Sequence, residues 1–116
     1  MDIRRGEIYL VSLDPTVGSE IKKTRPALII QNDVGNKYSP LTIIAPITST
    51  PKKKIYPTQV SVTTEKTGLD SNSVVLLDQI RTVDKSRLVR KLGALSREKM
   101  KEVDEAIRIS LAIPHD

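Results

Sequence analysis

The sequence predicts one small, mainly-β domain in which short strands form a closed barrel and one helix follows. Several apolar, β-branched runs have the length of strands and are separated by short polar connections. An amphipathic helical pattern is found near the C-terminus. The 116 residues include no Phe, Trp or Cys, so the core of this single domain must be built from Val, Ile, Leu and Ala.

The expected strands lie in the first 95 residues. A turn signal, Asp14-Pro15, ends the first of them, and a polar connection with room for one helical turn occupies residues 32–40. The strands share an apolar or alternating pattern; they are residues 7–13, 26–31, 41–48, 59–63, 73–83 and, as a short last one, 92–95. Residues 73–83 are the longest candidate. Six short strands with tight connections favour a small barrel.

Residues 96–112 predict an amphipathic helix that ends before Pro114. Ser96 is a typical N-cap residue, and Glu98 adds a negative charge in the first turn. Apolar residues recur at spacings of 3, 4 and 4, at Met100, Val103, Ile107 and Leu111. We expect this stripe to pack against the strands, although a face for a partner helix has the same pattern. The domain then spans residues 1–116, with the barrel over about 1–95 and the helix over about 96–112.

The net charge of +5 is concentrated in the N-terminal half, where residues 1–60 hold nine Lys and Arg against five Asp and Glu. A basic half indicates a polyanionic partner, either nucleic acid or an acidic protein, although ordinary solubility charge has the same appearance. The first residues carry charges where a signal peptide needs an apolar run, and no run reaches transmembrane length. We therefore expect a cytoplasmic protein without membrane contact.

Most familiar catalytic groups are missing from the sequence. The single histidine, His115, is next to the C-terminus, and there is no cysteine. Histidine acid–base pairs, Ser–His triads, the common metal-binding spacings and Gly-rich phosphate loops are all absent. We expect no metal and no cofactor. An enzyme of this composition would have to work with Arg, Thr, Ser, Glu or Asp.

Arg25 is the strongest candidate for function. Pro26 follows it and restricts it to extended geometry, so its guanidinium is expected at a strand entrance and not on a loop tip. A permanently charged fork with five donors suits a phosphate group. A plain surface residue at a strand start is the alternative interpretation of the same position.

These residue types can support the cleavage of RNA by attack of its own 2′-OH on the adjacent phosphodiester. The protein must stabilise charge that builds on the phosphate oxygens, which is a task for Arg25. Thr48 closes the run 41–48, and its hydroxyl can donate to the same phosphate or to the leaving 5′-oxygen; it can also be a simple β-former. Because a guanidinium stays protonated, we favour charge stabilisation over an acid–base role for Arg25. DNA lacks the 2′-OH, so RNA selectivity is expected.

Further candidates lie in the polar connections. The lysines 52–54 can steer phosphates or can form an ordinary solvated loop. Tyr56 lies beside them and is the best of three tyrosines for base stacking. Glu20 and Gln79 are weaker candidates, since each can be an ordinary loop or strand residue.

Taken together, these residues resemble a known family. The similarity follows the chain in order through Arg5–Tyr9, Gly18–Asn32, Ile44–Thr48, Leu76–Asp84 and Val103–Ala112. These segments are similar to the MazF/PemK toxins, the sequence-specific endoribonucleases of type II toxin–antitoxin modules. The resemblance covers nearly the whole chain.

The resemblance implies an SH3-like barrel with a C-terminal helix, and a homodimer with RNA across its interface. It implies metal-independent cleavage of single-stranded mRNA at a short motif, with 2′,3′-cyclic phosphate and 5′-OH products, which inhibits translation and growth. It also implies a cognate antitoxin with an acidic, flexible tail. Arg25 and Thr48 fall on the family's catalytic arginine and threonine. The candidate RNA-binding residues are Ser19, Glu20, Ser49, Lys52, Tyr56 and Gln79.

Two rival functions remain open on sequence grounds. A non-catalytic toxin on the same barrel would bind DNA gyrase, as CcdB-like proteins do, and would need no Arg25–Thr48 pair. A plain nucleic-acid-binding barrel would bind with steep salt dependence and leave its ligand unchanged.

Overall fold

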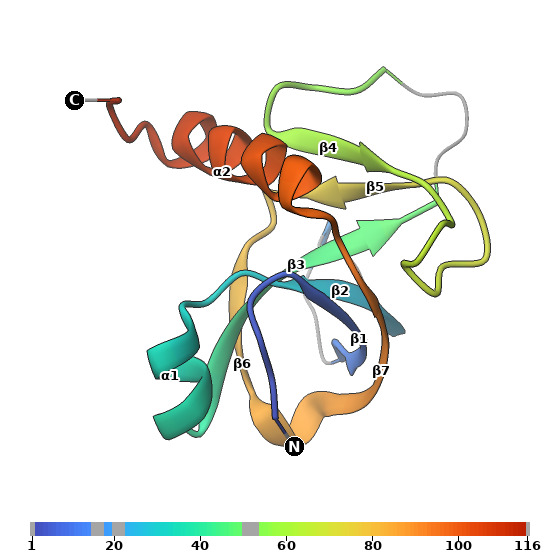
Figure 1. The fold of residues 1–116 in the computed structure, drawn as a ribbon, viewed down its shortest axis with the longest axis vertical. Helices are drawn as coiled ribbons and strands as arrows, with labels where there is room; N and C mark the ends of the chain where they lie inside the picture. Colours follow the sequence, from blue (N-terminus) through green and yellow to red (C-terminus); the bar gives the residue numbers. More distant parts are fainter. Residues whose placement is uncertain (1, 15–17, 20–22, 50–53, 116) are drawn as a thin grey trace.

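The computed structural model describes residues 2–14, 18–19, 23–49 and 54–115 (Figure 1). Seven strands and two α-helices are found in these residues, with one 3-10 turn, η1 (Lys85–Arg87), before the last strand. The strands are β1 (Glu7–Ser12), β2 (Thr24–Ile29), β3 (Leu41–Thr48), β4 (Gln59–Val62), β5 (Ser73–Leu76), β6 (Arg81–Asp84) and β7 (Leu88–Ala94). The helices are α1 (Asp33–Tyr38) and α2 (Arg97–Leu111).

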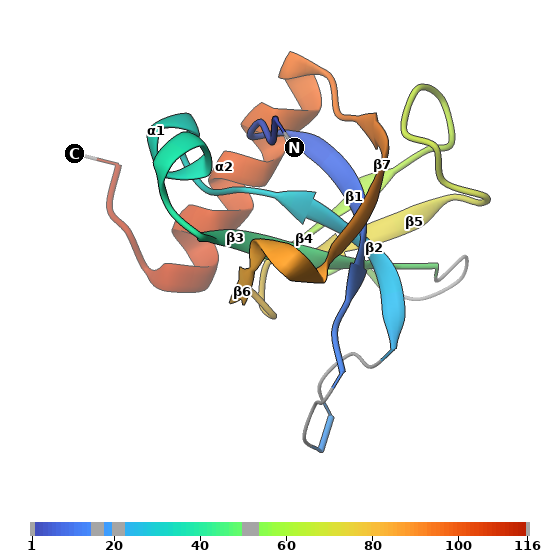
Figure 2. The ribbon, with the colours of Figure 1, turned by 90° about the horizontal axis from the view of Figure 1, so that it is seen from below.

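The strands form one antiparallel sheet in the order β4-β5-β3-β2-β1-β7, and β6 also pairs with β3. Strand β3 is the centre of this sheet, because β2 pairs with one of its edges while β6 and β5 share the other. Figure 1 shows α2 lying across β4 and β5, with the short α1 at the opposite end of β3. Figure 2 shows that the β1–β2 hairpin projects away from both helices.

The mainly-β fold with a C-terminal helix is confirmed, but the sheet is open. Its two outer strands are β4 and β7, and no ladder joins them within the described residues. The segment after β4 instead reaches β7 through one backbone hydrogen bond, from Ala94 N–H to the Lys66 carbonyl (3.2 Å). The fold is therefore barrel-like, with one side closed by a loop and not by a strand ladder.

The expected single strand over residues 73–83 is wrong, because a turn divides it. Ile47 pairs with Val75 and Ile44 pairs with Arg81. The two paired residues of β3 are three positions apart, whereas their partners are six positions apart. The three extra residues are accommodated in a turn that the Gln79 N–H closes onto the Leu76 carbonyl (3.1 Å). Periodicity could not indicate this break, since buried apolar residues continue up to the turn.

The last strand is longer than the expected 92–95. Strand β7 begins at Leu88, and its residues 89–91 are exposed. It pairs with β1 as an edge strand, with two register shifts, and Lys91 forms a salt bridge with Glu7 (2.6 Å). Exposed and charged residues are common on an edge strand, so the apolar pattern that marks a buried strand is missing there.

Helix α2 begins as expected. The Ser96 side chain accepts from the Lys99 N–H (3.1 Å), and the helix ends at Leu111 with Ala112 in the left-handed conformation, before Pro114. Val103 is fully buried, but Leu111 is 58% exposed, so its assignment to the packed stripe is wrong. At 3.6 residues per turn, Leu111 lies about 80° around the helix from Val103.

Alternation along the strands divides the core between two faces of the sheet. Leu28 belongs to a larger cluster that α2 covers with Val103 and Ala106. Ala27 and Ile29 point to the other face, into a smaller cluster with Ile3, Tyr9, Val11, Leu13, Ile44, Val83 and Leu88. Neither helix in the described part of the chain is long and apolar enough to span a membrane.

Candidate active site

The antiparallel pairing of β2 and β3 brings the two principal candidates to the same end of the strand pair. Ala27 pairs with Pro46 and Ile29 with Ile44, and the ladder ends at Ala27 and Pro46. Arg25 lies two residues before Ala27 and Thr48 lies two residues after Pro46, so both lie just beyond the end of this ladder. Two residues 23 positions apart in the sequence are thus carried by neighbouring strand ends.

This pair lies at the end of the smaller core cluster. Arg25 is the second residue of β2 and pairs with Val11 of β1, which is fully buried. Thr48 is the last residue of β3 and pairs with the buried Val74 of β5. Arg25 and Thr48 themselves are half-buried. A cation and a hydroxyl at the rim of an apolar layer interact more strongly with a phosphate than they would in bulk water.

The remaining candidate residues are spread along the ends of neighbouring elements. Ser19 is exposed in the connection between β1 and β2, and Ser49 is exposed directly after Thr48. Gln79 is half-buried in the turn between β5 and β6, on the edge of β3 that faces away from β2. Glu20 and Lys52 lie outside the described residues.

Tyr56 is presented to solvent on a fixed backbone. The residue is 55% exposed, and Lys54 Nζ lies 5.7 Å from the ring centroid. Its N–H donates to the Gln59 side chain (3.3 Å), and its carbonyl accepts from the Gln59 N–H (2.9 Å). An exposed ring on such an anchored segment can stack with a base.

Sequence reasoning missed Gln59 and Asp78 as supporting residues. The Gln59 amide donates to the Asp78 carboxylate at 3.5 Å, which joins the segment that bears Tyr56 to the turn that bears Gln79. Two candidate RNA contacts distant in sequence are thereby linked. The only signal in the sequence is a polar residue at the start of a strand, which is too common to identify such a link.

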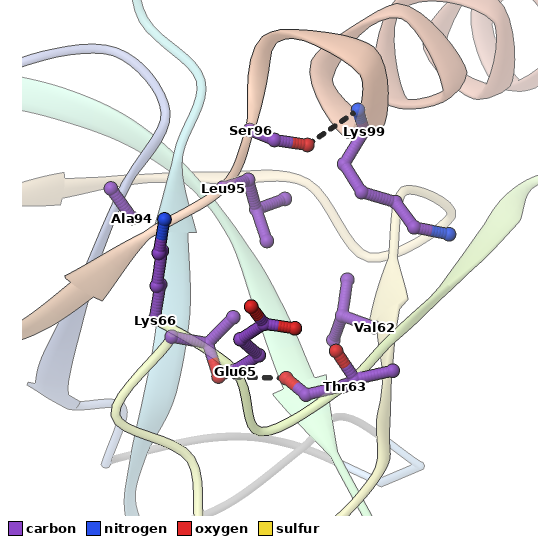
Figure 3. A pocket seen from close by; sticks show the side chains of 9 residues that line it. Val62, Thr63, Glu65, Lys66, Ala94, Leu95, Ser96 and Lys99 are labelled. Atoms are coloured by element: carbon purple, nitrogen blue, oxygen red, sulfur yellow. Dashed lines mark hydrogen bonds between the residues drawn. The ribbon is translucent and has the colours of Figure 1, made fainter.

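A separate hollow of about 560 Å³ does not include any of the predicted site residues. Figure 3 shows it between the segment after β4, the end of β7 and the first turn of α2. Two of its hydroxyl groups are used within the fold: Thr67 donates to the Thr63 carbonyl (2.7 Å), and Ser96 caps α2. This hollow lies at the base of α2, away from the strand ends that carry Arg25 and Thr48. The described residues also contain no cluster of three or more metal-ligating side chains.

Comparison with known proteins agrees with this fold. A family model described as "PemK-like, MazF-like toxin of type II toxin-antitoxin system" matches residues 4–111. Endoribonuclease EndoA of Bacillus subtilis is 48% identical over 113 residues, covering 97% of each chain. The structure of Mycobacterium tuberculosis toxin MazF-mt6 is 29% identical, with a TM-score of 0.79 over 93% of this chain and 98% of that one.

A mycobacterial endoribonuclease, solved in complex with its cognate antitoxin, has the same fold with a TM-score of 0.81 at 24% identity, over 98% of this chain and 99% of that one. The fold is thus that of a MazF-like toxin barrel. The chain belongs to the PemK-like, MazF-like toxins of type II toxin–antitoxin systems. This membership favours the endoribonuclease expectation over the gyrase-binding and plain nucleic-acid-binding alternatives.

Proposed function

We propose that this chain cleaves single-stranded RNA without a metal ion, with Arg25 and Thr48 at the reaction centre. The chain is an endoribonuclease toxin of a type II toxin–antitoxin system. The observation that supports the assignment of residues is the antiparallel pairing of β2 and β3, which brings the start of β2, with Arg25, and the end of β3, with Thr48, to the same end of the strand pair. A phosphodiester placed over this pair meets a cation and a hydroxyl at once.

In the proposed reaction, the 2′-oxygen of RNA forms a bond to phosphorus while the bond from phosphorus to the 5′-oxygen breaks. The 2′-hydroxyl loses its proton and the leaving 5′-oxygen gains one, which gives a 2′,3′-cyclic phosphate and a 5′-OH. Arg25 donates to the non-bridging oxygens, where charge develops. Thr48 donates to the phosphorane or to the leaving oxygen. RNA supplies the nucleophile itself, so the reaction needs no metal-bound water.

The surrounding residues are proposed to bind the RNA chain. Ser19, Glu20, Ser49 and Lys52 belong to the two connections that flank Arg25 and Thr48 in sequence. Tyr56 is proposed to stack on a base and Gln79 to contact a base edge, with their segments joined by the Gln59–Asp78 hydrogen bond.

The partners follow from the same proposal. A cognate antitoxin with an acidic, flexible tail suits the basic N-terminal half of the chain. A homodimer is supported by apolar side chains left exposed at the end of α2, namely Ile109, Leu111 and Ile113. Because mRNA is the proposed substrate, the cytoplasm is the proposed place of action, and the expected result is arrest of translation and growth.

The test is cleavage of a long single-stranded RNA in the presence of EDTA, followed by analysis of the new ends. We expect cyclic phosphates and 5′-hydroxyls, and no cleavage of DNA of the same sequence. Arg25→Ala should lower the rate by roughly 100- to 1,000-fold, the usual loss for one charge-stabilising donor. Arg90→Ala, which changes an exposed arginine on β7, is the matched control and should retain the rate. A requirement for metal, 5′-phosphate products or an active Arg25→Ala variant would refute the mechanism.

A further inference from the structure

Two arginines distant in sequence bind the end of β1. Arg87 donates through Nη1 to the carbonyl of Ser12 (3.1 Å) and also to that of Asp14. Arg81 donates through Nη1 to the carbonyl of Leu13 between them (3.1 Å). Three consecutive carbonyls are therefore held by guanidinium groups that come from β6 and η1.

These arginines act where a strand partner is missing. The pairing of β7 with β1 ends at Leu88 opposite Val11, so the residues of the first strand beyond Val11 have no further β7 residue beside them. Arg87 immediately precedes β7, and its side chain takes the place of the absent backbone. A backbone carbonyl that lacks a hydrogen-bond donor at a half-buried strand end costs folding free energy, and the Arg87 guanidinium supplies that donor.

Asp14 connects this end of β1 to the start of β2. Its carboxylate accepts from the Lys23 N–H (2.9 Å), and the Leu13 N–H donates to the Lys23 carbonyl (3.0 Å). Lys23 has a φ of 69°, a left-handed conformation that favours glycine, so its backbone needs such support. Lys23 lies two residues before Arg25.

We propose that Asp14 and Arg87 are positioning residues, which hold the β1–β2 hairpin so that the Arg25 guanidinium keeps its place at the start of β2. This inference rests on the proposed role of Arg25 in cleavage. Thr24 pairs with Ser12 and Arg25 with Val11, so fraying at the hairpin end reaches Arg25 within two residues. A slip of one residue would turn its side chain to the other face of the sheet. Displacements of about 1 Å from the reacting geometry can reduce a rate about 100-fold.

The hydrogen bonds of Asp14 are made at the exposed end of a hairpin, since Asp14, Lys23 and Thr24 are all exposed. Such an end opens locally without unfolding the domain. Their loss should therefore affect the position of Arg25 more than the global stability. This difference separates a positioning role from a merely structural one.

The first measurement is hydrogen exchange of the Lys23 amide by NMR, without RNA. Asp14→Ala should speed exchange by about tenfold or more, because the acceptor is lost. Asp14→Asn retains an acceptor oxygen and should stay within about threefold of the wild type. Ser96→Ala, which removes a similar exposed cap from α2, is the matched control and should leave this amide unchanged. Unchanged exchange in Asp14→Ala would overturn the proposal.

The second measurement is single-turnover cleavage at saturating RNA. Asp14→Ala and Arg87→Ala should lower the rate by roughly 10- to 100-fold with little change in KM, whereas Asp14→Asn, Ser96→Ala and Arg90→Ala should keep it. The melting temperature of Asp14→Ala should fall no further than that of Ser96→Ala. Wild-type rates in Asp14→Ala, beside an inactive Arg25→Ala, would refute the positioning role alone. An active Arg25→Ala would refute the proposed function, while the exchange data would still report on the hairpin.

Discussion

The Thr48→Val substitution should change the cleavage rate without changing the stability of the fold, and so tests the role of the Thr48 hydroxyl in the reaction. Valine keeps the β-branched shape that suits β3, and the described part of the chain offers the Thr48 hydroxyl no hydrogen-bond partner that would be lost. The free energy of unfolding should therefore change by no more than about 0.5 kcal/mol. The cleavage rate should fall by roughly 100-fold or more, or about 2.7 kcal/mol of transition-state stabilisation, if the hydroxyl donates to the reacting phosphate.

The assay is single-turnover cleavage of a short labelled RNA, with urea unfolding of the same preparations. Thr82→Val is the matched control, because Thr82 is an exposed threonine on β6 that pairs with Ile43. It should retain both stability and rate. Thr48→Ser keeps the hydroxyl and should retain the rate within about tenfold.

Two results would refute this reasoning. A rate in Thr48→Val above about a tenth of the wild type would show that the hydroxyl is not a donor in the transition state. A rise in KM with an unchanged rate at saturation would assign Thr48 to RNA binding instead.

Two further predictions concern the fold that carries the site. Gly68→Ala should lower the unfolding free energy by about 2–4 kcal/mol, because φ is +74° and the new Cβ would lie 2.1 Å from the Leu92 carbonyl oxygen. Gly18→Ala, at φ +61° in open space, is the control and should lower it by about 1 kcal/mol or less. Equal losses of unfolding free energy in urea titrations of the two variants would contradict a steric clash at Gly68. The pKa of Asp33 is lowered chiefly by the Arg5 backbone N–H, so its stabilisation is present at neutral pH and disappears as the pH falls through that lowered pKa. Asp33→Asn should therefore be less stable than the wild type at pH 7 and equally stable in strong acid, and a difference independent of pH would refute this linkage.

Local sequence signals were sufficient where one residue type dominates an element. Strand β3 has the predicted bounds, Leu41–Thr48, because a dense β-branched run suits a buried central strand. The N-cap of α2 at Ser96 was equally clear, since capping depends on a few adjacent residues. Pro26 correctly indicated an extended Arg25, which lies within β2.

The errors came from partners that are distant in sequence. The run 73–83 is interrupted because its two halves pair with different parts of β3, and pairing register is not a local property. The start of β7 was missed because an edge strand exposes charged residues. Leu111 fits the spacing of the helical stripe but lies away from the face that Val103 and Ala106 bury.

By itself, the amino-acid sequence determined the mainly-β class, the capped helix, the family resemblance, and the choice of Arg25 and Thr48 as candidates. Each of these depends on residue types and on short spacings that the chain carries wherever it folds. Only the tertiary structure decided that Arg25 and Thr48 lie at the same end of two neighbouring strands, and that Arg81 and Arg87 hold the end of β1. The arginine contacts join residues up to 75 positions apart, and their geometry exists only once the strands have paired.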